Sequence, residues 1–319
     1  MLVLVTGANG FVGKALLARC IADPSLRLRG STRAPVSEIL AGVEPMLVGE
    51  LASDTDWTEA LKGVSVVVHT AARVHVMHDV SFDRLREFRR VNVAGTLKLA
   101  GQAAAAGVRR FVFISSIKVN GERTEPGRPF TPDDPPAPVG PYGRSKQEAE
   151  EALRKLGLDT GMEIVIIRPV LVYGPGVKAN FLAMMRWLHR GIPLPFGAIH
   201  NRRSLVALDN LTDLVRTCLR HPAAANQTFL VSDDDDVSTE ALLHRVAMAM
   251  GTEARLIPVP VSVLRAAMRL FGKAEVAERL CASLQVDIER TRQLLGWAPP
   301  VSLDEGLRRT ARWFSARDD

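Results

Sequence analysis

Hydrophobic residues in the first half of the chain form short, β-branched runs separated by longer stretches with helical spacing. Four runs have the length and composition of strands buried on both faces of a sheet. They are Leu2 to Val5, Val64 to Ala72, Arg109 to Ser116 and Ile164 to Ile167. Because these runs alternate with helical patterns, the sequence predicts an α/β fold with a doubly wound parallel sheet, covered by helices on both faces.

Weaker patterns predict further elements. The expected strands are Leu26 to Gly30, Met46 to Val48, Thr228 to Val231 and the start of Val206 to Leu219, which continues as a helix. The other expected helices are 14–22, 54–63, 82–107, 180–190 and one that opens at Tyr142. The alternation loosens after residue 170, and the chain from Ser238 on is mostly helical.

One C-terminal stretch, Val263 to Phe271, carries apolar residues at helical spacing. A helix of this kind could lie on a membrane, but it more often packs on its own domain. No uninterrupted apolar stretch is long enough to span a bilayer. We therefore expect no stable membrane insertion.

The first strand leads into a glycine-rich turn with Gly7, Gly10 and Gly13, followed by a helix. Glycine allows a tight turn and a close approach of the backbone to a pyrophosphate, and the helix N-terminus offers N–H groups to that anion. The pattern indicates a Rossmann-type dinucleotide site. An ordinary strand–helix turn is the alternative, so the motif needs support elsewhere.

The end of the second strand bears on the choice of cofactor. An acidic residue there usually binds the ribose 2′-hydroxyl of NAD, but the segment Gly30-Ser-Thr-Arg33 has none. Arg33 could pair with a 2′-phosphate, which favours NADP over NAD. The alternative is a surface arginine on a loop.

Tyr142 and Lys146 lie four positions apart on a predicted helix and share one face. An ammonium beside a phenol favours the phenolate, so we expect Lys146 to lower the pKa of Tyr142. Such a tyrosine can exchange a proton with an alcohol or ketone. Ser116, at a strand end, could hydrogen-bond the same oxygen.

Composition narrows the function classes. The net charge of +6 is scattered, so a nucleic-acid partner is not expected, whereas an anionic small substrate fits. The three cysteines lack CxxC spacing and read as reduced thiols of a cytoplasmic protein. The opening strand has no basic n-region, so we expect no signal peptide. His75 and His78 lack further ligands at metal-binding spacing, so no metal is predicted.

Several segments, in order, resemble the extended branch of the short-chain dehydrogenase/reductase superfamily, which includes nucleotide-sugar epimerases, dehydratases and reductases. They are Thr6-Gly-Ala-Asn-Gly-Phe-Val-Gly13, His69-Thr-Ala-Ala72, Asn92-Val-Ala-Gly-Thr96, Phe113-Ile-Ser-Ser116, Tyr142-Gly-Arg-Ser-Lys146, Arg168-Pro169, Val172-Tyr-Gly-Pro-Gly176 and Leu295-Gly-Trp297. The resemblance implies a dinucleotide-binding domain over 1–170, with 204–232 returning to it. It also implies a smaller nucleotide-sugar-binding domain over 171–203 and 233–319.

The resemblance also assigns roles. It implies that Tyr142 is the acid/base, that Lys146 holds the ribose and tunes Tyr142, and that Ser116 binds the reacting oxygen. The residues expected to contact the cofactor are Gly7, Asn9, Gly10, Phe11, Val12, Arg33, Glu50, Leu51, Thr70, Ala71, Ala72, Asn92, Ser115, Tyr142, Lys146, Arg168 and Val170. Those expected to contact a UDP-sugar are His75, Ser116, Lys118, Asn180, Phe196, Arg203 and Arg279.

Two departures argue against a plain 4-epimerase. Val119-Asn120-Gly121 stands where UDP-galactose epimerases usually carry Val-Tyr-Gly, and their late Arg-x-Gly-Asp run is missing. The segments around Ser116 and Ala72 more closely resemble NAD(P)H-dependent reductases of bacterial surface-polysaccharide synthesis. These reduce the 4-keto group of UDP-2-acetamido-2,6-dideoxy-hexos-4-ulose, giving UDP-N-acetylquinovosamine or UDP-N-acetylfucosamine. Reduction of this keto-sugar is therefore the first hypothesis.

Three other functions compete with it. A UDP-glucose or UDP-N-acetylglucosamine 4-epimerase with tightly bound NAD is the main alternative. A dehydratase is not expected, because Ile117 and Lys118 occupy the places of its acidic pair. A non-catalytic, cofactor-sensing protein usually loses the Tyr or Lys, and both are present here. Family resemblance further suggests a homodimer in which helices 82–107 and 144–158 form a four-helix interface.

Overall fold

A parallel sheet forms the centre of the computed structural model, which describes residues 1–35, 40–74, 83–272 and 274–318. Within these residues the sheet has seven strands in the order β3-β2-β1-β4-β5-β6-β9. Their bounds are β1 Leu2–Thr6, β2 Arg27–Thr32, β3 Val43–Leu47, β4 Val66–His69, β5 Arg110–Ile114, β6 Glu163–Pro169 and β9 Thr228–Val231. The predicted doubly wound, Rossmann-type α/β fold is confirmed.

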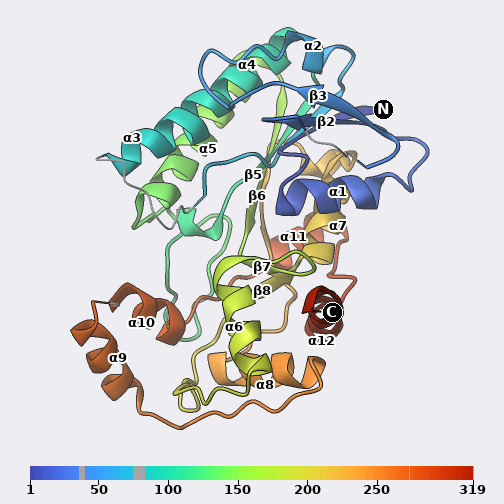
Figure 1. Cartoon of the computed structure of the whole chain (residues 1–319). Coiled ribbons are helices and arrows are strands. Elements are labelled where there is room, and N and C mark those ends of the chain that lie inside the picture. The colour runs from blue at the N-terminus through green and yellow to red at the C-terminus, as the bar shows by residue number, and fades with distance from the viewer. Residues whose placement is uncertain (36–39, 75–82, 273, 319) are drawn as a thin grey trace.

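Helices cover both faces of the sheet, as Figure 1 shows. One face carries α2 Thr58–Leu61, α3 Arg84–Arg89, the π-helical segment η1 Arg90–Gly95, α4 Thr96–Ala105 and α5 Pro141–Thr160. The other face carries α1 Phe11–Cys20, α7 Leu208–Cys218 and α11 Glu289–Leu295. The side chains of β1 alternate accordingly: Leu2 and Leu4 pack toward α4, whereas Val3 and Val5 pack toward α1 and α7.

The remaining elements lie beyond the carboxyl edge of the sheet, in the lower part of Figure 1. They are β7 Leu171–Tyr173 paired with β8 Leu205–Ala207, and the helices α6 Ala179–His189, α8 Thr239–Ala249, α9 Val261–Leu270, α10 Ala274–Cys281 and α12 Leu303–Asp318. Short 3-10 segments occur at η2 Ile117–Val119 and η3 Pro222–Ala224. Tyr173, Phe181 and Leu307 belong to a separate hydrophobic core here. The proposed division into two domains stays a prediction.

Two expected helices differ from the structure. The helix predicted from Asp54 begins only at Thr58, because the Asp56 carboxylate accepts hydrogen bonds from the Thr58 N–H and hydroxyl in a turn. The long helix over 82–107 is present from Arg84 but takes a π-helical path through Gly95. A Cβ on Gly95 would lie 2.7 Å from Leu51 Cγ, so the close approach of the 50–51 segment requires glycine there.

Candidate active site

The glycine turn between β1 and α1 has the backbone of a phosphate cradle. Gly7 adopts a φ of 67°, and the Gly10 N–H donates to the Gly7 carbonyl at 2.8 Å. A Cβ on Gly13 would lie 2.2 Å from that carbonyl oxygen, so only glycine fits. Gly10 caps α1 without a side chain, which leaves the first N–H groups of the helix for an anion. The turn therefore fits the diphosphate of a dinucleotide.

Neighbouring strands bring other predicted cofactor residues to the same edge. The Thr70 hydroxyl donates to the Thr6 carbonyl at 2.6 Å, and Ala71 lies against Gly7. Arg33 follows β2, which pairs with β1, and its side chain is exposed. Glu50 is also exposed. Contacts of these residues with a cofactor stay a prediction.

The remaining predicted cofactor residues differ in exposure. Asn9 is exposed, Phe11 and Val12 open α1 partly buried, and Val170 is buried after β6. Asn92 is buried, and its amide binds the backbone of Arg73 and the Ser145 hydroxyl. Asn92 therefore ties η1 to α5 and to the segment that follows β4.

Ser116 and Tyr142 meet at the end of β5. Ser116 caps η2, Tyr142 lies in the first turn of α5, and their side chains are close enough for the Ser116 hydroxyl to affect the pKa of the phenol. Burial raises the pKa of Tyr142 to about 12, while the interaction with Ser116 acts in the opposite direction. The predicted serine–tyrosine pair is thus assembled by the fold.

Lys146 does not act on Tyr142 as the sequence predicted. Its Nζ donates to the Ile114 carbonyl at 2.9 Å and lies 4.3 Å from the centre of the Phe113 ring. The expected lowering of the Tyr142 pKa by Lys146 is wrong for this structure, because burial dominates and the ammonium binds a carbonyl instead. Burial also lowers the pKa of Lys146 to about 7, and the nearby Glu150 carboxylate works against that shift.

The sequence analysis missed a buried ion pair near the serine and the lysine. Arg168 donates from Nε and Nη2 to the two carboxylate oxygens of Glu150, at 2.9 and 2.6 Å. Its Nη1 donates to Asn120 Oδ1 at 2.9 Å. The Ser115 hydroxyl donates to Glu150 at 2.5 Å, and Arg154 adds a further bond at 3.0 Å. This buried network, Glu150–Arg168–Asn120–Ser115, joins α5, β6, η2 and the end of β5.

The network changes the interpretation of two predicted cofactor residues. The guanidinium of Arg168 and the hydroxyl of Ser115 both have partners inside the protein, so the structure gives no support to direct cofactor contacts by these groups. Glu150 follows Lys146 by four positions, as Lys146 follows Tyr142. That spacing was the sequence signal for a third residue on the same helix face.

A buried histidine also lies near the site. His69, at the end of β4, shares hydrogen bonds with the hydroxyls of Thr6 and Thr96 at 2.7 and 3.0 Å. Burial, and then the charge of Lys146, lowers its pKa to about 3. His69 is therefore neutral, and its role in the structure is to join β1, β4 and α4.

The predicted sugar-binding residues are brought together only in part. The Arg203 guanidinium donates to the Arg279 carbonyl, so these two arginines do meet. Phe196 is partly buried between two hydrophobic clusters, whereas Asn180 is exposed in the first turn of α6. Lys118 pairs with Glu122 at 2.9 Å. His75 and His78 lie outside the described residues.

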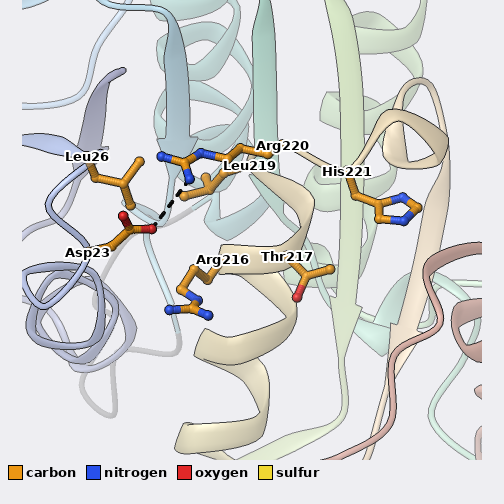
Figure 2. A pocket seen from close by; sticks show the side chains of 7 residues that line it. All are labelled: Asp23, Leu26, Arg216, Thr217, Leu219, Arg220 and His221. Carbon is orange, nitrogen blue, oxygen red and sulfur yellow. Dashed lines mark ion pairs between the residues drawn. The ribbon is translucent and has the colours of Figure 1, made fainter.

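The opposite, amino edge of the sheet has a separate hollow of about 300 Å³. Figure 2 shows its lining between the start of β2 and the end of α7. Arg220 points toward Asp23 and pairs with it at 3.5 Å, whereas His221 points away. The polar side chains do not converge, and the hollow lies at the wrong edge to join the candidate site.

Neither a metal site nor a membrane span is present in the described part of the chain. No group of three His, Cys, Asp or Glu side chains there could hold a metal ion. No helix there is both long and apolar enough to cross a bilayer.

The model of the NAD dependent epimerase/dehydratase family matches residues 3–232. The chain belongs to this family. A UDP-glucose 4-epimerase of Vibrio cholerae is 48% identical over 98% of this chain and 95% of its own. The solved UDP-glucose 4-epimerase of Thermotoga maritima, with UDP-glucose, superposes over both whole chains with a TM-score of 0.79 at 21% identity. The UDP-glucuronic acid 4-epimerase of Bacillus cereus, with NAD, gives 0.80 at 20% identity and covers 99% and 96%.

Membership confirms the family that the sequence indicated and identifies the chain as an enzyme of the NAD-dependent epimerase/dehydratase type. The two solved structures share too little sequence with the chain to add more than the fold. Their superposition over both domains of the predicted division agrees with the doubly wound sheet and the helical C-terminal part.

Replacing Glu150 by Gln should lower the free energy of unfolding by about 3 to 5 kcal/mol, because Arg168 would keep its charge in a buried place without a counter-charge. Urea denaturation measures this. Glu148→Gln is the matched control, since Glu148 lies on the same helix but pairs with Arg89 at the surface. Equal losses of unfolding free energy in the two variants would contradict the interpretation that Glu150 and Arg168 form a buried ion pair.

The buried amine should also make stability depend on pH. Between about pH 7 and pH 10 the unfolded chain keeps a proton on Lys146 that the folded protein has lost. The free energy of unfolding of wild type minus that of Lys146→Met should therefore rise with pH, by up to about 1.4 kcal/mol per unit. Urea titrations from pH 6.5 to 9.5 measure the difference. A difference in unfolding free energy that does not change with pH would show that Lys146 has the pKa of an ordinary lysine.

Proposed function

We propose that the protein is a UDP-sugar 4-epimerase that works with a retained NAD. The observation that carries this proposal is that Ser116 and Tyr142 lie close together at the sheet edge that also carries the glycine turn, in a chain that is 48% identical to a UDP-glucose 4-epimerase over nearly its whole length. The same relative supports the epimerase better than the 4-ketoreductase that the sequence analysis placed first.

One of the two departures from the epimerases has a structural explanation. Asn120, which stands in place of a tyrosine, is buried and joins the Arg168 side chain to the Thr131 carbonyl, to which it donates at 2.9 Å. Its role in the structure is to support the framework. The substitution therefore does not count against a sugar epimerase.

The residues at the site could serve the reaction as follows. NAD, when bound, would supply the hydride acceptor and donor for carbon 4 of the sugar. Tyr142 would take the proton of the 4-hydroxyl and later give it back, while Ser116 would hydrogen-bond the same oxygen. The Tyr142 pKa of about 12 leaves the phenol protonated at neutral pH. The positive charge of the oxidised nicotinamide would favour the phenolate.

The C-terminal part would hold the rest of the substrate. Arg203 offers a forked cation suited to a diphosphate, and Arg279 lies next to it. Residues 171–203 and 233–319 would then form the proposed sugar-binding domain. The homodimer through helices 82–107 and 144–158, and the cytoplasmic location, also stay predictions.

An assay without added cofactor tests the proposed activity. Purified protein should interconvert UDP-glucose or UDP-N-acetylglucosamine with its galacto epimer, and Tyr142→Phe should be at least about 100-fold slower because it lacks the acid/base hydroxyl. Nuclear magnetic resonance of the sugar signals measures both. Failure to epimerise either sugar, with stoichiometric NAD(P)H consumption on the 4-keto-6-deoxy sugar, would establish the ketoreductase instead.

Cofactor choice is tested by thermal unfolding of protein from which the retained cofactor has first been removed. We expect NAD to raise the melting temperature more than NADP, in keeping with the family. The Arg33→Ala variant should show the same shift with NAD as wild type, because NAD has no 2′-phosphate for Arg33 to bind. A larger shift with NADP that is lost in Arg33→Ala would instead support the NADP reading of the sequence.

A further inference from the structure

Helix α9 has an apolar face that the rest of the described structure leaves exposed. Its inward residues Val261, Leu264 and Met268 pack with Ile199 and Cys281. A second row with the same spacing, Val263, Ala266 and Leu270, points the other way and is exposed. Phe271, directly after the helix, is 79% exposed, and Leu270 is 88% exposed. We call Val263, Ala266, Leu270 and Phe271 the outer face of α9.

The position of α9 makes this face accessible. In Figure 1, α9 and α10 lie at one extremity of the molecule, far from the central sheet. Val276 of α10, the helix that contacts α9, is exposed as well. Single exposed apolar residues are common, but a continuous row on one short helix marks a surface that meets another apolar phase.

The charges on α9 indicate what that phase is. Arg269 lies on one flank of the outer face and is exposed, and the helix contains no Asp or Glu. Arg265 lies 3.5 Å from Glu278 of α10. The whole chain carries a net charge of +6. Apolar residues bordered by an exposed arginine, with no acidic residue on the helix, suit the interface of a bilayer that contains anionic lipids.

A second copy of the chain suits this face less well. In a two-fold symmetric contact the same patch meets itself, so the arginines of α9 would face their own copies.

We propose that the outer face of α9 docks the enzyme reversibly on the surface of an anionic bilayer. Leu270 and Phe271 would enter the boundary of the acyl chains, while Arg269 binds headgroup phosphates. The docked helix packs on α10, which carries Arg279, the partner of Arg203. This proposal does not depend on which sugar the enzyme converts.

Cosedimentation with vesicles tests it. Full-length protein should bind vesicles of phosphatidylglycerol and phosphatidylethanolamine, and bind pure phosphatidylcholine vesicles at least tenfold more weakly. The double variant Leu270→Glu/Phe271→Glu should lose binding at least tenfold, and Arg269→Gln should weaken it. Met248→Glu is the matched control, since Met248 on α8 is 70% exposed, lies outside the outer face of α9 and should bind as wild type does.

Other results of these experiments would contradict the proposal. Binding that is absent, equal for the two lipid compositions, or unchanged in the double variant would overturn the proposal. A light-scattering mass that falls from dimer to monomer in the double variant would show that a second copy covers the face, which also overturns it. Circular dichroism confirms that the variants are folded, as expected for changes at exposed positions.

Discussion

Two opposite charges buried together, on Glu150 and Arg168, hold the candidate site in place. Such a pair is tolerated because its polar atoms have partners: Ser115 and Arg154 on the carboxylate, and Asn120 on the guanidinium. Its members come from α5, β6, η2 and the end of β5, which also carry Tyr142, Lys146 and Ser116. The bidentate geometry therefore fixes the distance between the helix with the phenol and the strand end with the serine.

The ionisable groups of this region are largely buried, and burial is the main cause of the shift in each pKa. Lys146 lies against a carbonyl and an aromatic ring, His69 is neutral, and Tyr142 keeps its proton. In such surroundings a charged cofactor has a strong effect, because little solvent screens it. Proton exchange at Tyr142 would therefore be coupled to binding of the oxidised cofactor, since the protein's own lysine does not lower the phenol's pKa in this structure.

The proposal of an epimerase over a reductase gives more weight to similarity over the whole chain than to local sequence differences. An unusual residue at Asn120 suggested a different reaction, yet the structure places this side chain in the framework behind the site. Asn120 follows η2, four positions after Ser116, and a residue so near to a serine in the sequence need not face the substrate. Similarity over the whole chain is the better guide here.

The amino-acid sequence by itself determined the sheet, the glycine turn and the pairing of Tyr142 with Ser116, because these depend on local periodicity, on glycine and on the ends of parallel strands. The tertiary structure decided what depends on residues far apart in the chain. The partner of Lys146 is a strand carbonyl, Arg168 binds Glu150, and the outer face of α9 is exposed. Helical spacing reveals that a face is apolar, but only packing shows whether anything covers it.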